Sequence, residues 1–241
     1  MTLEEFFTQH PRTAVAFSGG TDSAMVLWAA GRYGRDVRAY YVHTVFQPAF
    51  ELADAKRLAE ELDVPLTVVE ADVLAVPEAA ANGPRRCYYC KKALFTTLWQ
   101  RAREDGYTVL LDGTNASDDA GDRPGMQALR ELEVRSPLRE CGITKAEVRR
   151  MSKEAGLFTW DKPAYACLAT RVPTGTAITR KALEKVERGE NALFRLGFSD
   201  FRVRLLGDAA RIQVPADQME RALALRGEIN RALEADFSAV L

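Results

Sequence analysis

The sequence is short of the features that mark disulfide-rich, secreted and strongly charged proteins. Its 241 residues include four cysteines and two histidines, and 33 basic side chains nearly balance 34 acidic ones, for a formal net charge of −1. So few cysteines in a chain of this length argue against a disulfide framework, and we expect these thiols to bind metal or to take part in catalysis. The near-neutral charge supplies no overall field for holding a polyanion such as tRNA, although a local basic patch is compatible with it.

Long hydrophobic runs are missing as well. The longest one, around 24–30, is far too short to span a bilayer, and the acidic start Met1-Thr2-Leu3-Glu4-Glu5 is not typical of a secretory or transit segment. We therefore expect a cytoplasmic protein with no membrane partner. With 47% hydrophobic and 28% charged residues, the chain can form one sizeable core and a small second one.

The first two thirds of the chain alternate short β-branched runs with longer helical patterns. The last helix of this part has a capping box at its start, because Glu147 follows Thr144 by three residues. The alternation predicts an α/β fold with a doubly wound, mostly parallel sheet. The predicted elements are strands over 13–17, 37–42, 66–69 and 107–111, helices from about 22 and over 51–62, 91–104 and 144–155, and an irregular stretch over 72–86.

A different rhythm begins after Lys162. A loop rich in proline and glycine leads to a predicted helix over 180–196, and a terminal helix is predicted from about 216. Between them, two predicted strands, 201–206 and 210–214, flank the turn Gly207-Asp208. Helix, hairpin and helix make a small α+β unit. We therefore expect two domains, 1–162 and 163–241.

A glycine-rich turn follows the first predicted strand. The string Ser18-Gly19-Gly20-Thr21-Asp22-Ser23 leads from that strand into a helix, so that several backbone N–H groups point at an anion. The glycines permit close approach, the hydroxyls of Ser18 and Ser23 add donors, and Asp22 is a candidate ligand of Mg²⁺. A Gly-Gly turn alone often only connects two elements, but the whole string favours a phosphate or pyrophosphate site.

A second candidate site element, Asp112-Gly113-Thr114-Asn115, stands at the carboxyl end of the fourth predicted strand. Ligands of doubly wound sheets bind at this edge of the sheet. A plain turn explains the same residues equally well when they are considered alone.

These elements carry a resemblance to a known family. The string from Ser18 to Ser23 matches the signature of PP-loop ATP pyrophosphatases, and within that superfamily the chain resembles the LarE-type sulfur transferases of nickel-pincer cofactor biosynthesis. The matching segments are Ser18 to Ser23, 86–92, Gly113-Thr114-Asn115 with Asp118, Arg123-Pro124-Gly125, Ser136-Pro137-Leu138, 166–169 with Arg171 and Pro173, and Arg202-Val203-Arg204. The last three of these segments are specific to the LarE type, whereas the glycine-rich turn indicates only the superfamily.

The resemblance implies a reaction and a set of ligands. ATP is cleaved to AMP and pyrophosphate with Mg²⁺, a carboxylate of a pyridinium-3,5-dicarboxylate mononucleotide is adenylylated, and sulfur converts it to a thiocarboxylate. It also implies a homo-oligomer. The residues implied to bind ATP are Ser18, Gly19, Gly20, Asp22, Ser23, Gly113, Thr114 and Asn115, with Asp22 on magnesium.

The cysteines leave several interpretations open. From the residues alone, Cys87-x-x-Cys90 is compatible with a redox pair, half of a zinc site or iron–sulfur ligation, and Cys167 with a buried core position. The resemblance implies that Cys167 is catalytic, either by giving up its own sulfur and ending as dehydroalanine, or by holding a [4Fe–4S] cluster with Cys87 and Cys90. Arg171 or Lys162 could lower the pKa of its thiol. A purely structural C-x-x-C pair is the remaining interpretation, and Cys141 has no assigned role.

The predicted hairpin over 201–214 is rich in arginine. Period two places Arg202 and Arg204 on one face, and a turn at 207–208 pairs Arg204 with Arg211 and Arg202 with Gln213. Like charges opposite each other are destabilising, so a bound phosphate is the natural counter-ion for these forks. An ordinary solvated strand face is the alternative. The resemblance favours a site for the phosphate of the substrate on Arg202 and Arg204, to which we add Arg211; Glu190 on the preceding helix is a weaker candidate for the same cleft.

Two other functions fit the glycine-rich turn. One is a PP-loop enzyme that thiolates RNA, against which the near-neutral charge and the absence of an evident RNA-binding appendage argue. The other is a non-catalytic ATP-binding protein, against which the complete string and Cys167 argue.

Overall fold

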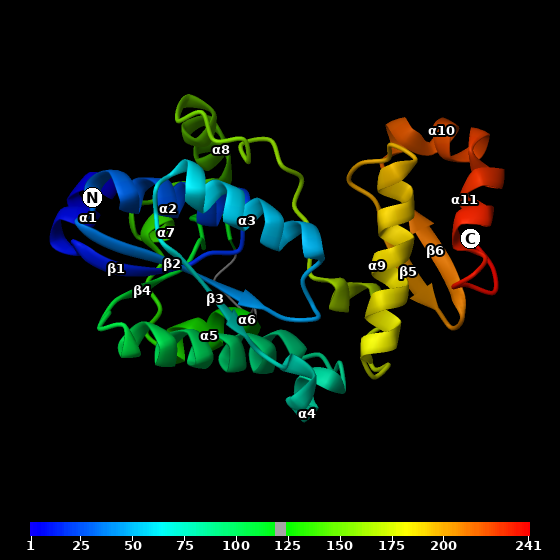
Figure 1. The fold of residues 1–241 in the computed structure, drawn as a ribbon, viewed down its shortest axis with the longest axis horizontal. Coiled ribbons are helices and arrows are strands. Elements are labelled where there is room, and N and C mark those ends of the chain that lie inside the picture. The colour runs from blue at the N-terminus through cyan, green and yellow to red at the C-terminus, as the bar shows by residue number, and fades with distance from the viewer. Residues whose placement is uncertain (119–123) are drawn as a thin grey trace. The chain divides into compact units, whose positions relative to one another are not determined.

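The computed structural model describes residues 1–118 and 124–241 of the chain (Figure 1). Arg123, part of one of the matching segments, lies outside the described residues. The chain divides into two compact units, of which the first contains Met1–Val76 and Cys87–Lys162, and the second contains Pro77–Arg86 and Pro163–Leu241. The described helices include none that is both long and apolar enough to cross a membrane.

A four-stranded parallel sheet forms the centre of the first unit, in the order β3-β2-β1-β4. Strands β2 and β4 lie on opposite sides of β1, so the order of the strands reverses between β1 and β4. In sheets of this kind, ligands bind in the crevice beyond the carboxyl ends of the two strands at this point. The predicted α/β fold with a parallel sheet is confirmed. The strands are β1 (Arg12–Ala16), β2 (Asp36–His43), β3 (Leu66–Glu70) and β4 (Leu110–Leu111).

The fourth strand is shorter than the predicted 107–111. Only Leu110 and Leu111 form ladder pairs, with Ala14 and Val15 of β1. An apolar β-branched run is compatible with a longer strand, but the number of residues that pair depends on where the neighbouring strand lies.

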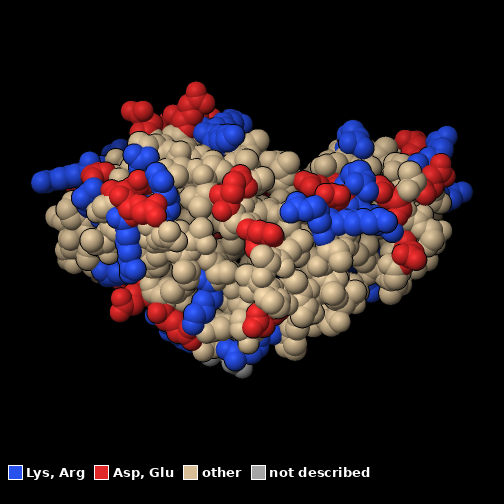
Figure 2. Space-filling model, turned by 60° about the horizontal axis from the view of Figure 1, so that its bottom comes forward, with Lys and Arg blue, Asp and Glu red and all other residues tan. Residues whose placement is uncertain are grey.

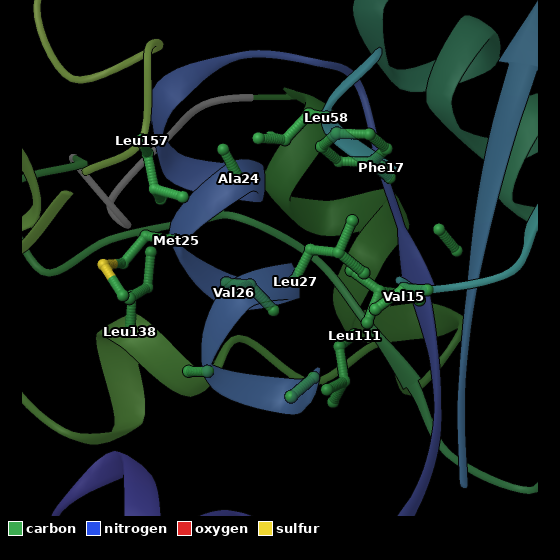
Figure 3. Packing of buried hydrophobic residues seen from close by; sticks show 14 of the residues in the cluster. Val15, Phe17, Ala24, Met25, Val26, Leu27, Leu58, Leu111, Leu138 and Leu157 are labelled. Carbon is green, nitrogen blue, oxygen red and sulfur yellow. The ribbon is translucent and has the colours of Figure 1, made fainter. Parts of the chain in front are cut away.

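Both faces of this sheet are covered by helices. Successive strand side chains point to opposite faces, so Val15 and Leu111 pack with Leu27 of α2 in one cluster, while Ala14 and Leu110 belong to a second cluster with α5. Figure 3 shows the first cluster around α2. Each fully buried side chain of this size contributes about 1.5–3 kcal/mol relative to an exposed one. The helices of the unit are α1 (Leu3–Gln9), α2 (Thr21–Tyr33), α3 (Ala49–Glu61), α5 (Arg86–Glu104), α6 (Pro124–Glu131), α7 (Pro137–Glu140) and α8 (Lys145–Glu154).

The helices differ from the prediction at one place that matters for function. The helix predicted over 91–104 begins at Arg86, so Cys87 and Cys90 lie inside α5 and not before it. The physical reason is tertiary: the guanidinium of Arg86 donates to the side-chain oxygen of Asn82 at 2.6 Å and to the carbonyl of Ala169 at 3.1 Å. The capping box predicted at Thr144 is confirmed, with reciprocal bonds to Glu147.

The second unit packs helices on an antiparallel hairpin. Its core contains Leu193 of α9, Val203 of β5, Ala210 of β6 and Leu233 of α11. The predicted terminal helix is interrupted at Leu225 and forms two short helices. The elements are α4 (Pro77–Ala80), α9 (Arg180–Arg195), β5 (Arg202–Leu206), β6 (Ala209–Gln213), α10 (Met219–Ala224) and α11 (Arg226–Leu233).

Asn82 explains why the segment 77–86 belongs to the second unit. Its buried side-chain nitrogen donates to the carbonyls of Val172, Pro173 and Thr176 at 3.3, 2.9 and 3.0 Å. Its backbone adopts φ +56°, a left-handed conformation that asparagine tolerates better than most residues. One side chain therefore ties this segment to the loop that follows the Cys167 region.

Candidate active-site residues

The glycine-rich turn connects β1 to the N-terminus of α2. Gly19 has φ +74°, and a Cβ there would lie 3.1 Å from the carbonyl oxygen of Glu51. The hydroxyls of Ser18 and Ser23 lie 3.0 Å apart, and that of Ser23 donates to the carbonyl of Gly20 at 3.1 Å. Because Gly20 is the N-cap and has no side chain to accept the first N–H groups of α2, these groups are suited to an anion.

The second predicted element lies against this turn. A Cβ on Gly113 would be 2.7 Å from the backbone nitrogen of Ser23, so only glycine permits this approach. The side-chain nitrogen of Asn115 donates to Asp22 at 3.2 Å. The structure therefore brings the two sequence-predicted ATP elements together at the β1/β4 switch point.

Lys145 joins this cluster and was not expected from the sequence. Its ammonium lies 2.5 Å from the Asp22 carboxylate, with 35% of the lysine side chain and 26% of the aspartate side chain exposed. A positive charge in the first turn of a helix is unfavourable because it faces the positive end of the helix dipole. The position of Lys145 directly after the N-cap Thr144 could therefore have indicated that this lysine has an acidic partner. Lys145 is a cation that can hold a phosphate oxygen once ATP is bound.

Asp112 organises the loop after β4. It is buried, and its carboxylate accepts hydrogen bonds from the Thr114 hydroxyl at 2.5 Å and the Ser136 hydroxyl at 2.6 Å. The backbone nitrogen of Asn115 donates to Asp118 at 3.0 Å. These contacts explain why Ser136 and Asp118 accompany the glycine element in the matching segments.

Lys162 is bound within the first unit. Its ammonium lies 2.6 Å from the carboxylate of Asp54 and donates to the carbonyl of Gly19 at 3.3 Å. The hydrogen bond to Gly19 ties the glycine-rich turn to a residue that is distant in the sequence.

Cys87 and Cys90 stand three residues apart in α5, on one face of that helix. The four cysteines all lie in the described part of the chain, and no disulfide joins them there. Cys167 belongs to the second unit. Within residues 1–118 and 124–241, no three His, Cys, Asp or Glu side chains are grouped as a metal site.

The C-x-x-C turn of α5 is tied to α6 by Glu131. Its carboxylate accepts from the Tyr88 hydroxyl at 2.8 Å and from the Lys92 ammonium at 2.6 Å. The hydrogen bond from Lys92, followed by that from Tyr88, lowers the pKa of Glu131 to about 2. The tyrosine and the lysine that surround the cysteines therefore have a structural role.

Cys167 begins a single 3₁₀ turn, Leu168–Arg171, in a loop with little regular structure. Carbonyls of this loop accept hydrogen bonds instead from arginine side chains, of which Arg171 belongs to the turn itself and the others to other parts of the second unit. The donors and the carbonyls that accept from them are Arg202 to Ala164 at 2.6 Å, Arg171 to Ala166 at 2.9 Å, Arg86 to Ala169 at 3.1 Å and Arg204 to Thr170 at 2.5 Å.

The arginine hairpin has the predicted register. Arg204 lies opposite Arg211, and Arg202 lies opposite Gln213. Burial, then the neighbouring charges of Arg171, Arg211 and Arg202, lower the pKa of Arg204. This accumulation of positive charge is a local environment that a bound phosphate would stabilise.

Figure 2 shows one face of the molecule, on whose described part Lys and Arg side chains lie among Asp and Glu side chains.

Comparisons with known proteins agree with this geometry. A family described as asparagine synthase matches residues 8–153. An uncharacterized protein of Synechocystis is 40% identical over 91% of this chain and 82% of its own length. Pyridinium-3,5-bisthiocarboxylic acid mononucleotide synthase of Lactiplantibacillus plantarum is 35% identical over 93% of this chain and 82% of its own length. An uncharacterized protein of Methanocaldococcus jannaschii is 29% identical over 89% of this chain and 82% of its own length.

The matched family covers the unit with the parallel sheet, and the synthase aligns with nearly the whole chain. Both the glycine-rich turn and the Cys167 loop fall within the length aligned with the synthase. This chain therefore belongs to the LarE-type ATP-dependent sulfur transferases of the PP-loop ATP pyrophosphatase superfamily.

Proposed function

We propose that this enzyme adenylylates a carboxylate of a pyridinium-3,5-dicarboxylate mononucleotide and converts it to a thiocarboxylate. At family level, its function is sulfur transfer in nickel-pincer cofactor biosynthesis. The observation that carries the proposal is the close packing of Gly113 against the N-terminus of α2, which places the PP-loop, Asn115 and Lys145 around Asp22. Such an arrangement suits MgATP and the pyrophosphate that leaves it.

In the first step, a carboxylate oxygen of the substrate attacks the α-phosphorus of ATP, and the bond from that phosphorus to pyrophosphate breaks. The N–H groups at the start of α2 and the ammonium of Lys145 stabilise the charge that develops on the phosphate oxygens. Asp22 is our candidate for holding Mg²⁺, which would add positive charge at the same oxygens. The acyl-adenylate then has AMP as a leaving group, which a free carboxylate lacks.

In the second step, sulfur attacks the acyl carbon and the bond from that carbon to AMP breaks. We propose that Arg202, Arg204 and Arg211 bind the phosphate of the mononucleotide, because their charges already accumulate on one side of the hairpin. Cys167 lies in the loop whose carbonyls Arg202 and Arg204 contact. The phosphate site and the sulfur site are thus neighbours in the second unit.

For the source of sulfur we favour a cluster. Cys87 and Cys90 fit two positions of a [4Fe–4S] cluster, because thiols three residues apart share a helix face, and Cys167 would be the third ligand. Held by these three thiolates, a cluster would supply an iron without a protein ligand, at which sulfide would bind. In the alternative, the thiolate of Cys167 displaces AMP to form a thioester. Loss of its Cα proton then breaks the Cβ–Sγ bond, leaving dehydroalanine and the thiocarboxylate.

The test is turnover after anaerobic iron–sulfur reconstitution, with ATP and the pyridinium substrate, followed by absorption spectroscopy and intact mass. We expect iron–sulfur absorption, AMP as the nucleotide product and an unchanged protein mass. A mass loss of one H₂S without such absorption would replace the cluster by a sacrificial Cys167. Formation of ADP in place of AMP would contradict the adenylylation step.

Cys167→Ala and Cys141→Ala form a matched pair for this assay, since both thiols are partly buried. We expect the first change to abolish thiocarboxylate formation and the second to leave it unchanged. Full activity of the first variant would remove both sulfur mechanisms, and thiolation of tRNA by the wild-type protein would favour the RNA-modifying alternative.

A further inference from the structure

A buried ion pair stands beside the Cys167 loop in the second unit. The side chains of Arg171 and Glu190 are 0% and 1% exposed, and they form two nitrogen–oxygen contacts of 2.7 and 3.2 Å. Removing two charges from water is unfavourable, so a buried pair is weak evidence for a gain in stability, and specification of one conformation is among its attested roles. The hydrogen bonds that Arg171 and Glu190 make show which part of the main chain this pair holds.

Arg171 reaches the reactive residue through its remaining nitrogen. That nitrogen donates to the carbonyl of Ala166 at 2.9 Å and to the hydroxyl of Thr170 at 2.8 Å. The same hydroxyl donates its one hydrogen to the carbonyl of Cys167 at 2.9 Å. The guanidinium therefore holds the peptide before Cys167 directly and the carbonyl of Cys167 through Thr170.

Glu190 connects this arrangement to the proposed phosphate site. Its carboxylate, on α9, accepts from the backbone nitrogen of Val203 at 3.0 Å and from the hydroxyl of Tyr165. Val203 stands on β5 between Arg202 and Arg204. One carboxylate thus links the strand that carries the proposed phosphate-binding arginines to the guanidinium that holds the cysteine loop.

We propose that Arg171, oriented by Glu190, is a positioning residue that holds the main chain of Cys167 in its reactive arrangement. The role rests on the function proposed for Cys167, and it applies whether that residue ligates a cluster or gives up its sulfur. Misplacement of a reacting group by about 1 Å can slow a reaction roughly a hundredfold. Loss of the hydrogen bonds from Arg171 should therefore slow sulfur transfer. Adenylylation should be unchanged, because the residues proposed for it lie in the first unit.

Two variants separate positioning from folding. Arg171→Lys keeps the positive charge for Glu190 but replaces the planar fork by a single ammonium, which cannot make all the contacts of the fork. Thr170→Val removes only the hydroxyl that joins Arg171 to Cys167 and leaves the buried pair in place. Arg188→Lys is the matched control, because Arg188 stands on α9, the helix that carries Glu190, and pairs with Asp236 at the surface.

Three measurements on the full-length protein decide the matter. They are substrate-dependent ATP–pyrophosphate exchange, kcat and KM for thiocarboxylate formation, and the rate at which iodoacetamide alkylates Cys167. For Arg171→Lys and Thr170→Val we expect kcat to fall about tenfold to a hundredfold, the alkylation rate to change severalfold, and exchange and KM to stay as in the wild type and in Arg188→Lys.

The proposal would be overturned if both variants had the kcat and the alkylation rate of the wild type. It would also be overturned if ATP–pyrophosphate exchange and sulfur transfer were lost in parallel, together with a fall in melting temperature. If the wild-type protein forms no thiocarboxylate, the proposed function fails. The alkylation rates of Cys167 then decide the positioning role by themselves.

Discussion

The glycine-rich turn after β1 and the loop that carries Cys167 are held in place by different means. In the first unit, the glycine-rich turn closes on itself through the short side chains of Ser18 and Ser23, and close packing of Gly113 completes it. In the second unit, long arginine side chains, one from the turn itself and the others from other elements, donate to the carbonyls of the Cys167 loop. The first loop depends on small residues and short side chains, and the second depends on long side chains.

This difference follows from the chemistry that each loop serves. A phosphate site needs backbone N–H groups that remain available to the ligand, so bulky side chains are excluded from it. A loop with one 3₁₀ turn has few backbone partners, and its carbonyls need donors from elsewhere. Added volume should therefore damage the first loop, whereas loss of hydrogen bonds and charge should damage the second.

The largest effect should come from Gly113→Ala. The new Cβ would lie 2.7 Å from the backbone nitrogen of Ser23, so the start of α2 has to move. We expect kcat/KM for ATP to fall about a hundredfold and the free energy of unfolding to fall by about 1–3 kcal/mol. Steady-state kinetics and urea denaturation measure the two quantities.

Gly227→Ala is the control for this substitution in the second unit. A Cβ on Gly227, within α11, meets no atom within 4 Å. It should stabilise the protein by up to about 1 kcal/mol, because alanine favours a helix over glycine. Equal ATP kinetics in the two variants would contradict the steric interpretation of the first loop.

The next largest effect should come from Arg204→Met. Loss of a charge-assisted fork to phosphate costs about 1.5–3 kcal/mol, so KM for the pyridinium mononucleotide should rise about tenfold to a hundredfold. The affinity for ATP should not change. Arg226→Met, which removes a guanidinium from the first turn of α11, is the control, and a KM equal to that of wild type in Arg204→Met would rule out the phosphate role.

Helix caps should have a smaller effect, of similar size in the two units. Thr144 caps α8 and accepts from Glu147, while Thr179 caps α9 and accepts from Ala182. We expect Thr144→Ala and Thr179→Ala each to lower stability by about 1 kcal/mol. Amide hydrogen exchange should locate the loss in α8 for the first variant and in α9 for the second, and a loss spread over both helices in either variant would argue against separate units.

The smallest effect should be a pH dependence at the C-x-x-C end of α5. Hydrogen bonds from Lys92 and Tyr88 lower the pKa of Glu131 from 4.5 to about 2. The ionised carboxylate therefore contributes stability that is present above pH 4.5 and is lost as the pH falls toward about 2. Urea denaturation of wild type and Glu131→Gln should give midpoints that differ above pH 4.5 and converge below it.

Lys92→Met is the partner variant for this test, since it removes the ammonium and keeps the carboxylate. It should weaken the same acid-dependent loss of stability. An unchanged profile in both variants would show that solvent screens this exposed network completely.

Local patterns in the sequence were sufficient for several features. The parallel sheet, the glycine-rich turn after β1, the capping box at Thr144 and the pairing of Arg204 with Arg211 are all confirmed. Each depends on residues that are close in the chain or on a fixed period, so no knowledge of distant contacts is needed. The roles assigned to Cys87, Cys90, Cys167 and the arginines stay predictions, because geometry alone does not test them.

Other features could not be predicted from local sequence patterns. The early start of α5 depends on Arg86 meeting Ala169, and the ion pair at Asp22 depends on Lys145. The short β4 likewise depends on where β1 lies. In each case the partners are far apart in the chain, and neither periodicity nor turn chemistry specifies which distant residues meet.

The alternation of strands and helices around the parallel sheet, the glycine-rich turn after β1 and the register of the arginine hairpin could be predicted from the amino-acid sequence, because backbone sterics and side-chain alternation act over a few residues. Tertiary structure alone placed 77–86 in the second unit, brought Gly113 against Ser23 and buried Arg171 against Glu190. Those outcomes depend on packing and desolvation, which are properties of the folded chain as a whole.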